Sequence, residues 1–293
     1  MAVEPEQQLR AYVEYLRDLG VHDFYRQGEP SAAEVAGDAV RVALDISVES
    51  QPVVESPVVE ELKEAPPSRP STRPVFLEPP IAKLVSFDDL APLPESRVAA
   101  AHKADALVAI QKEIGDCTRC PLAYAGRRTI VFGDGDANAR LMFVGEGPGA
   151  DEDASGVPFV GKAGQLLNNM IQAMGLKREE VYIANIVKCR PPANRVPEPV
   201  EANICDQFLL QQIDVVQPKV VVALGATAAM YLLGVKQSLS ALRGRWHSCR
   251  GAKLAVTYHP AFLLRDPRMK GEAWKDLQMV MKEMGLKGAS KES

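Results

Sequence analysis

The stretch from Leu141 to Gly164, LMFVGEGPGADEDASGVPFVGKAG, constrains the fold of this chain more than any other part of it. It opens with an apolar run at 141–144 that is typical of a buried strand. The glycines in the following segment GEGPG allow positive φ and let another group approach the backbone closely. A helix with one apolar side is expected after Lys162. This order predicts a ligand site at the carboxyl edge of an open α/β sheet, and a simple tight turn is the alternative for the glycines alone.

Apolar segments of two kinds alternate along the rest of the chain. Buried strands are predicted at 141–144, 181–187, 220–224 and 254–258. Helices are predicted at 107–114, 162–175, 199–213, 226–234 and 272–284. Strands that are apolar throughout and separated by helices indicate a parallel sheet covered on both faces. We therefore predict an α/β fold, a three-layer α/β/α sandwich around a short parallel sheet, over residues 98–286.

The N-terminal third has a different character. Residues 1–100 hold 9 Lys+Arg and 18 Asp+Glu, whereas residues 101–293 hold 25 and 20. Residues 1–27 predict a short amphipathic helix, which either docks on a protein partner or is merely tethered. Residues 28–97 are rich in Pro, Val and Glu without periodicity, which predicts a disordered acidic linker, and 287–293 are expected to form a flexible tail.

Composition excludes some locations and leaves one broad class of partner open. The chain has no apolar run of the ~20 residues that cross a bilayer, and its N-terminus lacks the basic and apolar regions of a signal peptide. We expect a cytoplasmic protein that does not bind membranes. The modestly basic C-terminal part is compatible with a polyanionic partner.

Four cysteines suggest a metal centre. Cys117 and Cys120 form a C-x2-C pair, and Cys189 and Cys205 follow at long separations that the fold must bridge. In a cytoplasmic α/β protein, four thiols are better explained by a metal than by disulfides. Zinc and an iron–sulfur cluster both accept four thiolates, and the spacing does not decide between them. We interpret Cys249 as a packing residue.

Four motifs recur together with these cysteines. They are GEGPGADED at 145–153, VPFVGKAG at 157–164, NIVKCRPPANR at 185–195 and HPAFLLR at 259–265. In this combination the chain closely resembles the family 4 uracil-DNA glycosylases, the iron–sulfur members of their superfamily, over about residues 98–286. The resemblance implies the α/β/α fold, a [4Fe–4S] cluster on the four cysteines, and hydrolysis of the N-glycosidic bond of deoxyuridine in DNA. This reaction initiates base excision repair.

The resemblance also assigns roles around the base. Phe159 resembles the aromatic residue on which the flipped base stacks, and the amide of Asn185 is expected to donate to uracil O4 and accept from N3–H. An asparagine in an otherwise apolar strand is costly unless its hydrogen bonds are met, which favours a functional role. The backbone at Gly147 and Gly149 is expected to position uracil or water. His259 is expected to face uracil O2 and stabilise the charge on the departing base.

The sequence does not identify the group that activates water. The best-known uracil-DNA glycosylases have an aspartate where this chain has Gly147, so the candidates are Glu146, Glu152 and Asn194. Glu152 has an alternative role, which is to wall the pocket against the thymine methyl group. For Asp151 and Asp153 we expect a solvated turn.

A second group of residues is expected to contact DNA. Leu263, Leu264 and Arg265 resemble the wedge that enters the minor groove, where apolar side chains separate base steps. Basic residues beside the motifs are candidate phosphate contacts: Lys162, Lys188, Arg190, Arg195 and Arg268. The expected partner is uracil-containing DNA, single- or double-stranded, bound by a monomer.

Three other functions compete with this interpretation. The first is a non-catalytic, zinc-stabilised DNA-binding module, and the second is a related glycosylase that accepts a broader set of deaminated bases. The third, a nucleotide-binding enzyme, is disfavoured because 145–149 lacks the Gly-Lys-Ser/Thr ending of a P-loop. Sequence alone does not determine whether other deaminated bases are accepted.

Overall fold

The computed structural model describes residues 84–288. The helix expected at 1–27, most of the linker expected at 28–97 and the tail from residue 289 lie outside this range. The strands are β1 (Asp134–Gly135), β2 (Leu141–Gly145), β3 (Tyr182–Asn185), β4 (Val220–Leu224), β5 (His247–Cys249) and β6 (Ala252–Thr257). The α-helices are α2 (Phe87–Leu90), α3 (Lys103–Ile114), α4 (Ala150–Ser155), α5 (Lys162–Ala173), α6 (Pro199–Val216), α7 (Ala226–Leu233), α8 (Leu239–Leu242), α9 (Pro260–Arg265) and α10 (Lys270–Met284).

The strands form one mixed sheet in the order β1-β3-β2-β4-β6-β5. The central pairs β3–β2, β2–β4 and β4–β6 are parallel, as predicted, whereas β1 and β5 pair antiparallel at the two edges. The predicted parallel sheet is thus extended at each edge by an antiparallel strand that the sequence did not reveal. From β2 the chain continues to β3 on one side and then to β4 on the other, which makes the carboxyl end of β2 a topological switch point. Ligands of open α/β sheets bind at such points.

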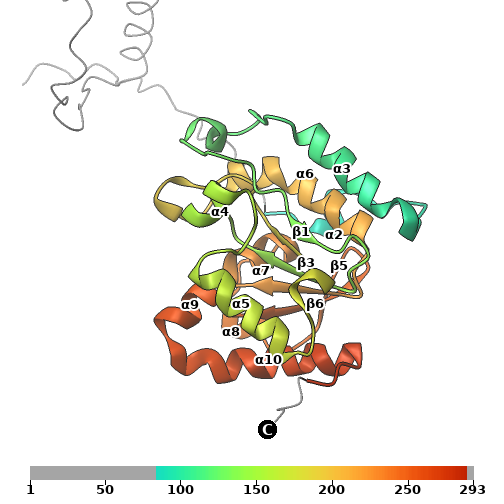
Figure 1. Ribbon diagram of the computed structural model, residues 1–293, viewed down its shortest axis with the longest axis vertical. Coiled ribbons are helices and arrows are strands. Elements are labelled where there is room, and N and C mark those ends of the chain that lie inside the picture. Colours follow the sequence, from blue (N-terminus) through green and yellow to red (C-terminus); the bar gives the residue numbers. More distant parts are fainter. Residues whose placement is uncertain (1–83, 289–293) are drawn as a thin grey trace, which may run out of the picture. The chain divides into compact units, whose positions relative to one another are not determined.

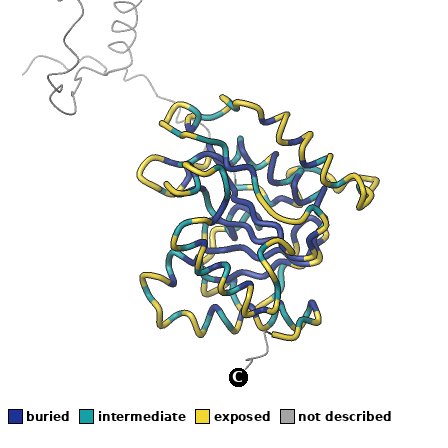
Figure 2. Tube along the Cα trace, viewed as in Figure 1, coloured by how far each residue is buried: buried dark blue, intermediate teal, exposed yellow. Residues whose placement is uncertain are grey.

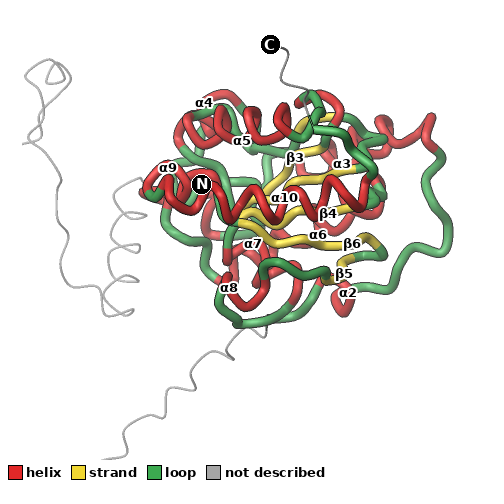
Figure 3. The backbone as a smooth tube through the Cα atoms, turned by 90° about the horizontal axis from the view of Figure 1, so that it is seen from below, coloured by secondary structure: helices red, strands yellow, loops and turns green. Residues whose placement is uncertain are grey.

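Helices cover both faces of the sheet, so the predicted three-layer sandwich is confirmed. Figure 1 shows α3 and α6 on one face and α5 and α10 on the other, and Figure 3 looks onto α10 where it crosses the strands. Two apolar clusters fill the spaces between the layers, one against α3, α6 and α7 and one against α5 and α10. The four parallel strands are buried almost throughout (Figure 2), which explains their continuous apolar sequences.

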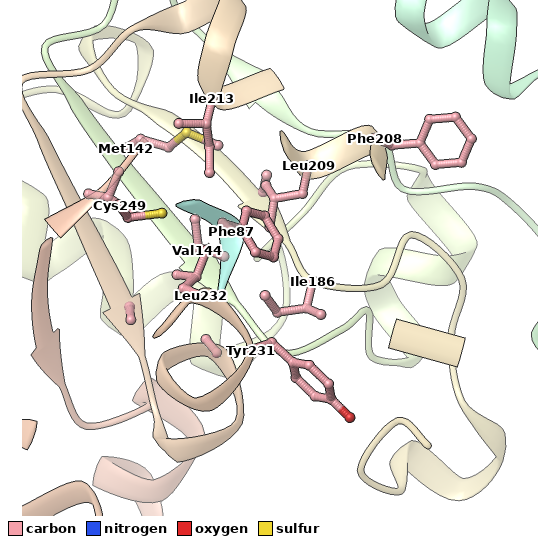
Figure 4. Close-up of a cluster of buried hydrophobic side chains, with 14 of the residues drawn as sticks. Phe87, Met142, Val144, Ile186, Phe208, Leu209, Ile213, Tyr231, Leu232 and Cys249 are labelled. Atoms are coloured by element: carbon pink, nitrogen blue, oxygen red, sulfur yellow. The ribbon is translucent and has the colours of Figure 1, made fainter. Parts of the chain in front are cut away.

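Residues 84–97 belong to the folded domain, so our prediction that the linker extends to residue 97 is wrong for this part. Phe87 in α2 is 1% exposed and lies in the core cluster shown in Figure 4. The guanidinium of Arg250 donates to the carbonyls of Phe87, Ala91 and Pro92 and forms a double contact with Asp214. Because one aromatic residue and one distant arginine hold this segment, its sequence shows no periodicity that would reveal it.

Candidate active site

The motifs meet at the carboxyl ends of the parallel strands. Here a cavity of about 590 Å³ opens between the loop after β2, the start of α5, the end of β3 and α9. Its walls include most of the residues expected in the site: Glu146, Gly147, Gly149, Glu152, Phe159, Lys162, Asn185, Asn194, His259 and Arg265. The fold therefore brings residues from all four motifs around one space.

Asn185 carries an unused hydrogen-bonding group in this cavity. The residue is 1% exposed and its Oδ1 atom is buried without a partner among the described residues. The register places Asn185 beside Gly145 on the neighbouring strand, and a Cβ atom on Gly145 would come within 2.4 Å of that oxygen. A buried amide oxygen without a partner is costly, so the position is explained best by a ligand that donates a hydrogen bond to it.

Phe159 is held in an unusual backbone conformation. Its φ is +54°, and its ring is buried with its centroid 5.6 Å from that of His259. A bulky residue adopts this conformation only when its surroundings impose it. Gly164 of α5 forms one side of these surroundings, since a Cβ there would lie 1.9 Å from the Phe159 carbonyl oxygen. The ring therefore has a fixed place beside Asn185 and His259.

His259 stands at the start of α9 as its N-cap. Its Nδ1 atom accepts a hydrogen bond from the backbone N–H of Ala261 at 3.1 Å. Burial, and secondarily the charge of Arg265, lower the pKa of His259 to about 4, although Glu152 acts in the opposite direction. The imidazole is therefore neutral near pH 7. Because Nδ1 is the acceptor, the proton lies on Nε2, which makes Nε2–H a hydrogen-bond donor.

The three acidic residues at 151–153 lie in three different environments. Asp151 is exposed, whereas Asp153 is buried and accepts hydrogen bonds from the backbone N–H groups of Arg128 and Thr129, so our expectation of a solvated turn is wrong for Asp153. Both carboxylate oxygens of Glu152 are occupied by backbone N–H groups: Gly149 at 3.0 Å, Val160 at 3.0 Å and Gly161 at 3.1 Å. Glu152 thus ties the glycine loop to the segment that carries Phe159.

The other two candidates for water activation also line the cavity. Asn194 accepts a hydrogen bond from Nε of Arg190 at 2.7 Å through its Oδ1 atom. Glu146 is partly exposed, and its carboxylate has no hydrogen bond to any described residue. A Cβ atom on Gly147 would lie 2.8 Å from Cγ2 of Val187, which leaves no room for an aspartate without a shift of that side chain.

The expected DNA wedge is narrower than we predicted. Leu263 is 1% exposed and packs in the core, so its assignment to the DNA-binding surface is wrong in this conformation. Leu264 is 43% exposed, and Arg265 and Lys162 are exposed at the rim of the cavity. In the helix α9 consecutive side chains point about 100° apart, so Leu263 is buried while Leu264 is exposed.

Three of the five proposed phosphate contacts are engaged within the protein. Arg268 donates to both carboxylate oxygens of Asp266, at 2.8 and 3.0 Å. Lys188 is buried, and its Nζ atom donates to the Asn185 carbonyl at 3.0 Å and to Oε1 of Gln212 at 2.6 Å, so Lys188 is not a surface cation. Arg195 forms a double hydrogen bond with Glu201. Arg190 and Lys162 have no ion pair among the described residues.

The four candidate metal ligands gather beside α6. Cys189 and Cys205 are buried, and Cys117 and Cys120 pack against the same cluster. Burial raises the pKa of the Cys189 thiol and the nearby sulfurs of Cys120 and Cys117 add to this, while the guanidinium of Arg127 acts in the opposite direction. N–H groups point at the sulfurs, from Arg127 to Cys189 at 3.3 Å and from the Lys188 backbone to Cys205 at 3.3 Å. In the described range, no group of three or more potential ligands is drawn together tightly enough to hold a metal ion.

Sequence reasoning missed Arg178 altogether. It lies in a short charged turn, Arg178–Glu180, that resembles a solvated surface. In the structure its guanidinium donates to the carbonyls of Pro158 and Phe159. No local signal marks this role, because its partners lie about twenty residues upstream.

A buried ring, an amide with an unused oxygen and a neutral imidazole at one sheet edge define a pocket for a planar, hydrogen-bonding base. Residues 132–278 match the family model described as the uracil DNA glycosylase superfamily. The chain is 46% identical over 159 residues to a type-4 uracil-DNA glycosylase of Thermotoga maritima, covering 54% of this chain and 82% of the relative. A type-4 uracil-DNA glycosylase of Pyrobaculum aerophilum is 44% identical over 174 residues, 57% of this chain and 88% of the relative.

The chain belongs to the uracil DNA glycosylase superfamily, in its type-4 branch. Similarity to the neighbouring branch is weaker. A type-5 uracil-DNA glycosylase of Pyrobaculum aerophilum is 30% identical over 178 residues, 50% of this chain and 78% of the relative. The match to the family model lies within the domain predicted at 98–286 and begins at residue 132.

Proposed function

We propose that this protein excises uracil from DNA by hydrolysing the N-glycosidic bond after base flipping, and so initiates base excision repair. The relatives named as type-4 uracil-DNA glycosylases support this activity. The single observation that carries it is the buried Oδ1 atom of Asn185, which lacks a partner and lies in the cavity with Phe159 and His259. A non-catalytic DNA-binding module has no need of that atom.

Recognition follows from the two side chains beside Gly145. A uracil flipped out of the helix stacks on the ring of Phe159, which contributes affinity without reading the identity of the base. The amide of Asn185 accepts from uracil N3–H through Oδ1 and donates to O4 through its amino group. Cytosine has a donor at position 4 and no hydrogen on N3, so it meets the same amide with the wrong pattern.

His259 stabilises the departing base. As C1′–N1 breaks, the bonding electrons move onto the base and negative charge grows on its O2 atom. The Nε2–H of the neutral imidazole donates a hydrogen bond to that oxygen, while the Ala261 N–H holds Nδ1 and fixes the tautomer. A donor that is oriented before the reaction stabilises charge without reorganisation. The low pKa of His259 means that it acts as a donor rather than as an acid that transfers its proton.

Glu146 is the best supported of the three candidates for orienting the attacking water. Both carboxylate oxygens of Glu152 accept hydrogen bonds from backbone N–H groups, three in all, and Asn194 Oδ1 is used by Arg190. Glu146 keeps a free carboxylate at the cavity. A sugar with oxocarbenium character needs only a weakly activated nucleophile, so one water-orienting carboxylate suffices.

Glu152 has a different proposed role. Its position in the cavity wall, fixed by Gly149 and Gly161, suits a rigid barrier against the methyl group at position 5 of thymine. A barrier excludes a methyl group only if it cannot move aside. The three backbone hydrogen bonds provide that rigidity.

The rim of the cavity meets DNA. We propose that Leu264 fills the space left by the flipped base, since it is the exposed apolar residue of α9. Arg265 and Lys162 then contact phosphates on either side of the opening, which sets affinity and its salt dependence rather than base choice.

We also propose a [4Fe–4S] cluster on Cys117, Cys120, Cys189 and Cys205. Their gathering beside α6, and the N–H groups that point at their sulfurs, fit thiolate ligands. The cluster would tie the segments around these cysteines together and takes no part in hydrolysis. Purified protein should show a broad absorption in the blue with about four iron and four sulfide per chain, as expected for this cluster type. A colourless protein with one zinc would contradict it.

The test of the function is incubation with oligonucleotides that carry a single U·G or T·G pair, followed by alkaline cleavage at abasic sites. We expect scission with U·G only, and at least a 100-fold slower rate after His259→Ala, as for removal of one oriented donor. If the U·G oligonucleotide stayed uncleaved at high enzyme concentration, the proposal would be contradicted. We further propose that the protein is cytoplasmic and monomeric. Gel filtration with light scattering measures its oligomeric state.

A further inference from the structure

The segment that carries Phe159 is held by opposite charges on its two sides. On one side the carboxylate of Glu152 accepts from the N–H groups of Val160 and Gly161. On the other side the guanidinium of Arg178 donates from Nη2 to the Pro158 carbonyl at 2.5 Å and from Nη1 to the Phe159 carbonyl at 3.1 Å. One side chain therefore captures two successive carbonyls.

Arg178 is itself fixed in place. Its Nη1 atom also donates to Oδ1 of Asn168 in α5 at 2.9 Å, and its Nη2 atom lies 3.5 Å from the carboxylate of Asp134. Its side chain is 23% exposed, so the planar guanidinium is largely removed from water. A fixed, planar fork with several donors suits two neighbouring acceptors better than the single ammonium group of a lysine.

The conformation of Phe159 explains why such a clamp is needed. A φ of +54° is unfavourable for a phenylalanine, and a peptide freed from its constraints returns to negative φ. That change would rotate the ring away from His259 and from the cavity. Gly164 packs closely against the Phe159 carbonyl and so restricts its movement, but this contact is steric and not a hydrogen bond.

We propose that Arg178 is a positioning residue for base stacking: by holding the carbonyls of Pro158 and Phe159 it keeps the Phe159 ring in the orientation that receives the flipped base. The inference rests on the proposed function, because it assumes that Phe159 stacks on uracil. Arg178 does not line the cavity, so it acts through Phe159.

The first test is a double-mutant cycle with the U·G oligonucleotide. We expect Arg178→Ala to lower kcat/KM by about 10- to 100-fold, which is the range that strain at one residue covers. In a Phe159→Ala background the same change should cost less than about 3-fold, since the ring it positions is gone. Arg178→Lys should recover only part of the loss. Equal losses in both backgrounds would overturn the proposal, as would an Arg178→Ala variant with wild-type kcat/KM.

The second test separates positioning from a general loss of structure. Binding is measured for two duplexes, one with an uncleavable 2′-fluorinated deoxyuridine and one with a tetrahydrofuran abasic site. Arg178→Ala should weaken binding to the first duplex and leave the second unchanged, because only the first offers a base to stack. The matched control is Arg140→Ala, which removes a donor to the Met284 carbonyl outside the cavity and should change neither affinity.

Equal weakening for both duplexes would assign Arg178 a purely structural role. Absence of uracil excision by the wild-type protein would instead refute the proposed function. The two failures are therefore distinguishable.

Discussion

Gly145 and Asn185 face each other across adjacent parallel strands so closely that a Cβ atom on the glycine would lie 2.4 Å from the asparagine oxygen and 2.6 Å from Cζ of Phe159. The absence of a side chain at position 145 therefore makes room for both groups that are proposed to contact the base. Gly145→Ala should displace Asn185 or Phe159 and lower the excision rate by about 100-fold, comparable to losing one oriented donor. Excision of uracil from a U·G oligonucleotide measures it.

The control for this change is Gly271→Ala. Gly271 lies in α10 with no neighbouring atom within 4 Å of an added Cβ, so the alanine should leave excision unchanged. Wild-type activity in Gly145→Ala would contradict the close approach.

The protonation state of His259 leads to a prediction about how stability and its ring signals depend on pH. Its pKa is about 4 in the folded protein and 6.5 in the unfolded chain, mainly because it is buried. The folded state thus disfavours the proton, and the stability that the neutral form contributes is complete above pH 6.5 and is lost as the pH falls toward 4. Nitrogen chemical shifts should report a neutral, Nε2-protonated ring from pH 8 down to pH 5. A ring that titrates near pH 6.5 would contradict the assignment of a neutral donor.

The segment before residue 98 should matter for stability. A chain that begins at residue 84 keeps Phe87 in the core and the carbonyl partners of Arg250, whereas a chain that begins at residue 98 loses them. We expect the shorter chain to be destabilised by about 3 kcal/mol or more, as for removal of a buried phenylalanine. Urea unfolding of the two chains measures the difference, and equal midpoints would show that this segment is dispensable.

The two leucines of α9 should respond differently to truncation. Leu264→Ala should slow excision from duplex more than from single-stranded DNA, because only a duplex leaves a gap to be filled. Leu263→Ala should instead lower the free energy of unfolding by about 2 to 5 kcal/mol, as for other buried leucines. Comparison of excision rates on both substrates with thermal unfolding of both variants tests this. If Leu263→Ala and Leu264→Ala both slowed excision from duplex to the same extent, without a difference in thermal unfolding, the assignment of the two leucines would be contradicted.

Much of the fold could be predicted from the sequence because its central strands are buried on both faces. The run Val220–Leu224 is apolar throughout and coincides with β4, and Gly115 ends α3 where expected. The edge strands gave no such signal. β1 is only two residues long and is defined by its pairing with β3, which is a tertiary contact.

The residues of the candidate site likewise fall into those that the sequence reveals and those that it does not. The residues proposed to contact the base, such as Asn185 and His259, lie in recognisable motifs at strand ends. Residues that support them do not, because their partners are backbone groups far away in the sequence. Arg178 lies in none of the motifs, and the sequence predicts a phosphate contact for Lys188, whereas the structure places both against carbonyl groups.

The central claim is that Phe159, Asn185 and His259 surround one uracil base. Its most direct test is titration of the protein with free uracil while the side-chain signals of Asn185 and His259 are followed by nitrogen NMR. We predict that both signals shift at the same uracil concentration, and that neither shifts with 3-methyluracil, which lacks the hydrogen on N3. Saturation by uracil with either signal unmoved, or equal binding of 3-methyluracil, would contradict the account.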